Sequence, residues 1–145
     1  MKITKKSLVL LLAVLLASLS SACGGPKETP LSGAEKEAVL KFSESKTDNL
    51  MAGMKAGDYA AFSKDFDQAM LNAMPQTAFE KFEQEYDGKL GAYVSRQVNA
   101  VNKSGSGKFV AVAYEAIFEK DDAVTVRVVF RAYDPHEISG LWFNK

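Results

Sequence analysis

The chain has 145 residues, of which 47% are hydrophobic and 25% are charged, and its formal net charge at pH 7 is zero. This length and apolar content are enough for the core of one compact domain. Lys and Arg are scattered singly, which argues against nucleic acid as a partner. A single cysteine excludes an internal disulfide, and a single histidine excludes most histidine-based metal sites and catalytic triads. We therefore expect neither a metal nor a cofactor.

The N-terminal stretch MKITKKSLVLLLAVLLASLSSACGG has the order of a secretory signal. Lysines precede an apolar run over residues 8–17, which is too short to span a membrane because a spanning helix needs roughly twenty residues. Small residues then lead into Cys23. This arrangement resembles the bacterial lipobox, whose cysteine is acylated on sulfur and becomes the mature N-terminus. We expect a lipoprotein signal peptide over residues 1–22 and lipidation at Cys23.

The sequence around Cys23 leaves an alternative open. Ser20 stands where the lipobox prefers an aliphatic residue, with Leu19 one position earlier, so ordinary signal peptidase could also cleave near Ala22 and leave a free thiol. An exposed thiol outside the cell is prone to oxidation, and this favours lipidation. Gly24 follows the cysteine where Asp would resemble an inner-membrane retention signal in a Gram-negative host. We expect a protein anchored to the bacterial cell membrane or outer membrane, with its domain outside the cytoplasm.

The rest of the chain divides into a lipidated tether over residues 23–31 and a single α+β domain over residues 32–145. Ser32 and Glu35 have capping-box spacing, which predicts that a helix begins at residue 33 and continues to about residue 55. Gly57 ends this helix, and Asp58 can cap the next one.

Two more helical segments are predicted before the strands begin. Apolar residues recur at helical spacing after Asp58, with a possible break near Asp67. Pro75 suits the first turn of a further helix that ends at Gly91. That helix carries its apolar residues on one face: Phe79, Phe82, Tyr86 and Leu90.

After Gly91 the apolar period changes to two, which predicts strands at AYVSRQVNAV, KFVAVAYEAIFE, AVTVRVVFRAY and ISGLWFN. The connections are too short to carry crossover helices, so the sheet must be an antiparallel meander. We therefore expect an α+β fold with N-terminal helices packed on a curved four-stranded antiparallel sheet. The strand KFVAVAYEAIFE is apolar on both faces, which predicts a central strand covered by helices on one side and by a partner subunit on the other.

The segments GDYAAFSKDFDQAM, NAMPQTAFEKFEQEYDGKLGAY and ISGLWF, between Gly57 and Lys145, resemble a bacterial family defined only as a domain of unknown function. Its members are often lipoproteins, and its fold is similar to nuclear transport factor 2, a cone-shaped, cystatin-like α+β fold. The resemblance covers roughly two-thirds of the chain and rests on helix starts, helix ends and strand packing. It implies a fold and no catalytic residue.

A cone-shaped fold can hold a small apolar ligand at its open end. The aromatic and basic residues predicted to line such a pocket are Tyr93, Tyr114, Arg127, Arg131, Tyr133 and Trp142. The plainer interpretation makes the aromatic residues core, with Trp142 packed against Phe143 or a helix, and makes the arginines a solvated strand face.

These observations favour a membrane-anchored lipoprotein whose domain binds a small ligand or an envelope protein without catalysis. One alternative is an isomerase or hydrolase-like enzyme that uses an acid in the pocket. Another is a structural module that forms a homodimer through its sheet.

Overall fold

The computed structural model describes residues 27–145, so the predicted signal peptide over residues 1–22 and the lipidation site Cys23 lie outside the described residues. Its helices are α1 (Gly33–Ala56), α2 (Tyr59–Phe62), α3 (Gln68–Ala73) and α4 (Gln76–Leu90). Its strands are β1 (Glu28–Pro30), β2 (Tyr93–Ser104), β3 (Phe109–Phe118), β4 (Asp121–Arg131) and β5 (Ile138–Asn144). Within this range, no helix has both the length and the apolar composition needed to cross a membrane.

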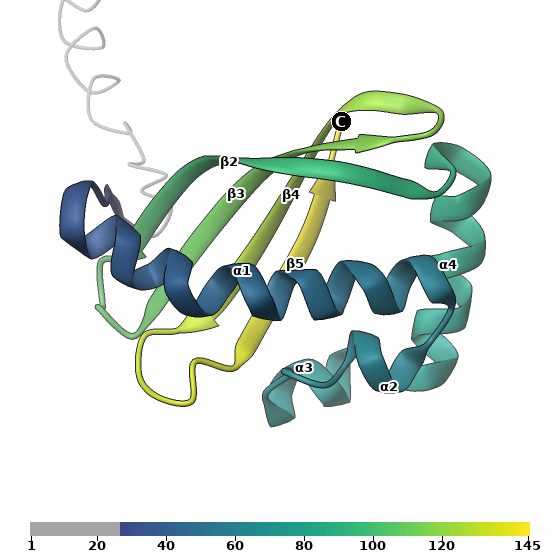
Figure 1. Ribbon diagram of the computed structural model, residues 1–145. Coiled ribbons are helices and arrows are strands. Elements are labelled where there is room, and N and C mark those ends of the chain that lie inside the picture. Colours follow the sequence, from purple (N-terminus) through teal and green to yellow (C-terminus); the bar gives the residue numbers. More distant parts are fainter. Residues whose placement is uncertain (1–26) are drawn as a thin grey trace, which may run out of the picture.

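The strands form one antiparallel sheet in the order β1-β2-β3-β4-β5, which curves around α1 (Figure 1). The α+β class and the meander are confirmed, but the expected count of four strands is wrong because β1 adds a fifth. Pro30 pairs with Asn102, and the Leu31 amide donates to the Val101 carbonyl at 2.8 Å. This strand lies inside the predicted tether over residues 23–31. Three residues, ETP, are too few to show the alternation by which a strand is recognised.

The helix boundaries follow the predicted caps with two exceptions, at Ser32 and Pro75. Gly57 ends α1 in the left-handed conformation, with φ of 65°. Asp58 and Asp67 cap α2 and α3 by accepting backbone hydrogen bonds at 3.1 and 2.8 Å. Ser32 precedes α1 but forms no side-chain hydrogen bond with it, so the predicted capping box is not formed. Pro75 lies immediately before α4 rather than inside its first turn.

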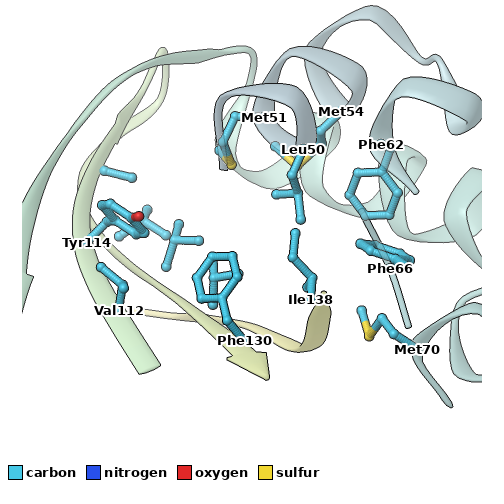
Figure 2. Close-up of a cluster of buried hydrophobic side chains, with 14 of the residues drawn as sticks. Leu50, Met51, Met54, Phe62, Phe66, Met70, Val112, Tyr114, Phe130 and Ile138 are labelled. Carbon is cyan, nitrogen blue, oxygen red and sulfur yellow. The ribbon is translucent and has the colours of Figure 1, made fainter. Parts of the chain in front are cut away.

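The core lies between α1 and the inner face of the sheet (Figure 2). Leu50 and Met51 of α1 pack there with Phe62 of α2, and all three are almost fully buried. The alternating side chains of β3 and β4 that face the helices are also buried: Val110, Val112, Tyr114, Ala116, Phe118, Val124, Val126, Val128 and Phe130. The period of two that the sequence predicted for these two strands is therefore confirmed.

The outer face of β3 is partly exposed to solvent, although the sequence predicted that a partner subunit covers it. Ala111 is buried and Ala113 is half-buried, but Glu115 and Ile117 are exposed. A partner subunit on this face stays a prediction.

The contact between α1 and α2 requires a glycine. A Cβ added to Gly53 would lie 2.2 Å from the Phe62 backbone nitrogen, which cannot move without displacing α2. We expect Gly53→Ala to lower the free energy of unfolding by about 1–3 kcal/mol, the usual cost of overpacking. Gly88→Ala is the matched control because nothing lies within 4 Å of its added Cβ. That substitution should raise stability by about 0.5–1 kcal/mol, since alanine is the better helix former. Equal effects of the two substitutions in urea unfolding would contradict this packing.

Candidate ligand site

The six residues predicted to line a pocket do not meet in one cavity of the described chain. Tyr93 begins β2 and lines a cleft beside α4. Tyr114 lies on the inner face of the sheet and is fully buried. Four residues lie on or beside the outer face at β4 and β5: Arg127, Arg131, Tyr133 and Trp142.

Tyr114 is held against α1 by a polar cluster. Its hydroxyl donates to Glu44 Oε1 at 2.9 Å and lies 3.1 Å from Thr47 Oγ1. The guanidinium of Arg96 lies over the ring at 4.9 Å from its centre and also donates to Asp48 at 2.7 Å. Burial raises the pKa of Tyr114 to about 12, so the hydroxyl is neutral at physiological pH. Tyr114 is thus a core residue that attaches α1 to β3, as the plainer interpretation of the sequence holds.

The remaining predicted residues lie at the outer face and do not form one site, because they take part in separate contacts. Arg127 of β4 forms an ion pair with Glu28 of β1. Arg131 donates to the Tyr133 hydroxyl at 2.7 Å. Trp142 is 51% exposed, and its ring occupies the space where a side chain of Gly140 would lie. Its expected packing against Phe143 or a helix is wrong, because alternation along β5 directs neighbouring side chains to opposite faces.

Two acids before α3 are paired with cations. Asp65 accepts hydrogen bonds from Lys46 at 2.8 Å and Asn49 at 3.0 Å. Asp67 is buried and accepts from Arg131 Nε at 2.9 Å and from Ser139 at 2.5 Å. Burial raises the pKa of each carboxyl, but these hydrogen bonds outweigh it and hold both pKa values below the usual range. A carboxyl that acts as a general acid in an apolar pocket has the opposite shift.

Two clefts lie on either side of Tyr86 on α4. The first, about 230 Å³, is lined by Met54, Lys55, Glu83, Gln84, Tyr86, Asp87, Gly91, Ala92 and Tyr93. The second, about 330 Å³, lies between α4 and β5 and is lined by Tyr86, Lys89, Leu90, Val124, Phe143, Asn144 and Lys145. The second volume is at the lower end of the roughly 300–1,000 Å³ usual for small-molecule sites. We call it the α4–β5 cleft.

Contacts between tilted aromatic rings form the apolar wall of the α4–β5 cleft. The ring of Phe143 lies 4.9 Å from that of Tyr86 and 5.3 Å from that of Phe82. Leu90 is buried at 3% exposure and Val124 at 1%, so the wall is fixed by the core behind it. A ligand could contact this preformed apolar surface without rearrangement of the fold.

Two ammonium groups add positive charge to the lining of the α4–β5 cleft. Lys89 donates to Glu85 at 2.5 Å, and the hydrogen bond and charge of this carboxylate raise the pKa of the lysine. Lys145 forms an ion pair with Asp121. Each ammonium has three N–H donors, so each can hold its acid and still bind an anionic group of a ligand.

The sequence analysis missed the α4–β5 cleft. Tyr86 and Leu90 were recognised as one face of a helix, and Phe143 as part of the last strand, but their meeting depends on where α4 lies against the sheet. In residues 27–145, no three His, Cys, Asp or Glu side chains are grouped to hold a metal ion.

A family model described as a protein of unknown function (DUF3887) matches residues 47–141. The match extends from the middle of α1 to β5 and includes Tyr86, Leu90 and Val124 of the α4–β5 cleft. No curated protein and no solved structure is significantly similar to the chain.

The pairing of Asp67 predicts a pH dependence of stability. Because the pKa of Asp67 is lower in the folded chain than in the unfolded one, its contribution is complete at neutral pH and is lost as pH falls below about 4. We expect Asp67→Asn to cost about 2 kcal/mol at pH 7, typical of hydrogen bonds to a charged group. Urea unfolding should show this difference shrinking towards pH 3. Asp122→Asn, at an exposed position at the start of β4, should change stability by less than about 0.5 kcal/mol at either pH. A difference for Asp67→Asn that does not change with pH would contradict the pairing.

Proposed function

The chain belongs to the DUF3887 family of proteins of unknown function, and we propose that it binds a small amphiphilic ligand without catalysing a reaction. The ligand we propose has an apolar body that fits the α4–β5 cleft and an anionic group that meets Lys89 or Lys145. The single observation that carries this proposal is the preformed apolar surface of Tyr86 and Phe143, backed by the buried Leu90 and beside two ammonium groups.

The proposal includes a lipid anchor at Cys23 and a location outside the cytoplasm, on the bacterial cell membrane or outer membrane. The order of basic, apolar and small residues before Cys23 supports it. A diacylated sulfur gives two lipid chains, and two chains anchor a protein stably where one anchors it only marginally.

We assign the domain to the nuclear transport factor 2-like folds. The support for this assignment is the long helix α1 lying along the inner face of a curved antiparallel meander, with α4 leading into β2 (Figure 1). In an enzyme of this architecture an acid would have to face a cavity between helix and sheet. Here that space is filled by Tyr114, Val112 and Val128, all at 0% exposure. This packing favours binding over catalysis.

A protein partner or a second copy on the outer face is the second candidate. The half-exposed rings of Trp142 and Tyr133 favour it, because Trp, Tyr and Arg dominate the binding energy of protein interfaces. Sedimentation of the full chain tests whether a second copy binds the outer face. Dimers that Trp142→Ala abolishes would support this candidate, and a monomer would exclude the homodimer.

The ligand proposal predicts charge-selective binding. Anilinonaphthalene sulfonate joins an apolar body to one negative charge, and unsubstituted anilinonaphthalene is its neutral counterpart. We expect Lys89→Glu/Lys145→Glu to weaken binding of the sulfonate by about tenfold in a fluorescence titration, because opposite charges are replaced by like charges at the site. Binding of the neutral compound should change little.

The matched control is Lys64→Glu/Lys81→Glu, which changes net charge equally at exposed lysines outside the cleft. Asn144→Trp should weaken binding of both compounds by filling the cleft. An equal loss of sulfonate binding in the two double variants would assign the effect to overall charge and reject the site.

The anchor has its own test. Expressed in a bacterium and extracted in detergent, the full chain should lack residues 1–22 and carry added acyl mass on the peptide that contains Cys23. Cys23→Ser should remove both the acyl mass and the flotation of the protein with vesicles. Detection of unmodified Cys23 in the wild-type protein would reject the anchor and leave the ligand site unaffected.

A further inference from the structure

Three exposed lysines lie at the end of the domain where the described chain begins. Lys27 precedes β1, Lys103 is near the end of β2, and Lys108 precedes β3. The turn between β2 and β3 touches the start of the chain, because a Cβ on Gly105 would lie 2.9 Å from the Lys27 carbonyl oxygen. Among residues 27–145, none of these three lysines forms an ion pair.

An exposed aromatic ring lies at the same end. The Ala132 amide donates to the Lys108 carbonyl at 2.9 Å, which places the segment after β4 beside the turn. Tyr133, the next residue, is 53% exposed. Tyrosine suits a membrane–water boundary because its ring is apolar and its hydroxyl is polar. We call Lys27, Lys103, Lys108 and Tyr133 the basic end.

The opposite end of the sheet carries a short segment in which acids predominate. Three acids and one lysine, in the sequence EKDD, form the turn after β3 and the first two residues of β4, and we call residues 119–122 the acidic turn. One of these acids, Asp121, is paired with Lys145. The strand β3 separates the two turns by its ten residues, or about 33 Å. The turn between β2 and β3 and the turn between β3 and β4 lie at opposite ends of the sheet (Figure 1).

The chain length limits how far the basic end can lie from an anchor at Cys23. Four residues lead from Cys23 to Lys27, and a fully extended chain covers at most about 3.6 Å per residue, or about 14 Å in total. The electrostatic screening length is about 10 Å at 0.1 M salt. The lysines can therefore reach the field of an anionic membrane surface, and the acidic turn lies about 33 Å from them along β3.

We propose that the basic end docks on anionic lipid headgroups and holds the domain upright on the membrane. This inference rests on the lipid anchor proposed above and adds an orientation to it. The lysines bind the headgroup phosphates, and Tyr133 lies at the boundary. The α4–β5 cleft, which includes Val124 at the start of β4 and Asn144 at the end of β5, then faces away from the membrane.

The test measures which end of the full lipidated protein is close to the lipid. Once Cys23 is acylated, Ser106→Cys in the basic end and Asp122→Cys in the acidic turn each provide one reactive thiol for a fluorophore. Each labelled protein is placed in phosphatidylcholine vesicles with or without phosphatidylglycerol, and a quencher is attached to the lipid headgroups. Acyl mass on Cys23 is confirmed first, and a chain without it would overturn the anchor and this proposal together.

We expect stronger quenching at Ser106→Cys than at Asp122→Cys in vesicles that contain phosphatidylglycerol. The difference should shrink in neutral vesicles and at about 1 M salt, where the screening length falls to about 3 Å. The double substitution Lys103→Glu/Lys108→Glu should remove the difference in quenching between the two sites. The control Lys64→Glu/Lys81→Glu should preserve that difference. Equal quenching at the two sites of an acylated protein would overturn the orientation. If the difference in quenching does not depend on salt, on lipid charge or on the two lysines, the tether alone orients the domain, and docking by the basic end is overturned.

Discussion

The packing of α1 on the inner face of the sheet is the contact on which the rest of the molecule depends. Leu50 and Met51 supply its apolar part, and the Tyr114 hydroxyl adds hydrogen bonds to Glu44 and Thr47. Because the Tyr114 hydroxyl and Thr47 are buried, loss of a partner would leave a polar atom without solvent, which is costly. The contact therefore fixes the position of α1 and fills the interior of the curved sheet.

Because buried side chains fill the space between α1 and the sheet, the surface available to a ligand lies at the margins of the domain. The helix α4 ends at Leu90 and is followed by Gly91, and Tyr86 and Leu90 line the α4–β5 cleft together with Phe143. The cleft lies at the same end of the sheet as the acidic turn, and the basic end lies opposite. Ligand binding and membrane docking, as proposed, thus use different ends of one rigid sheet.

The elements that depend on local patterns were predictable from the sequence, and those that depend on distant contacts were not. Gly57, Asp58 and Asp67 mark helix ends through their own conformation or side chain, and valines at every second position of β4 mark its inner face. Three-residue β1 is a strand only because β2 lies beside it. The predicted pocket residues do not meet because alternation assigns Tyr114 to the inner face and Arg127 to the outer one. The α4–β5 cleft brings together Leu90 and Phe143, which are more than fifty residues apart in the sequence.

An amide spectrum of the isotope-labelled chain during titration with anilinonaphthalene sulfonate tests most directly whether ligands bind at the margin. The account predicts that shift changes gather at Leu90, Val124, Phe143 and Lys145. Signals of Thr47, Tyr114 and Val128 should stay unchanged, because the space between α1 and the sheet is filled. Shift changes centred on those interior residues, or saturable binding with no change around the α4–β5 cleft, would contradict the central claim.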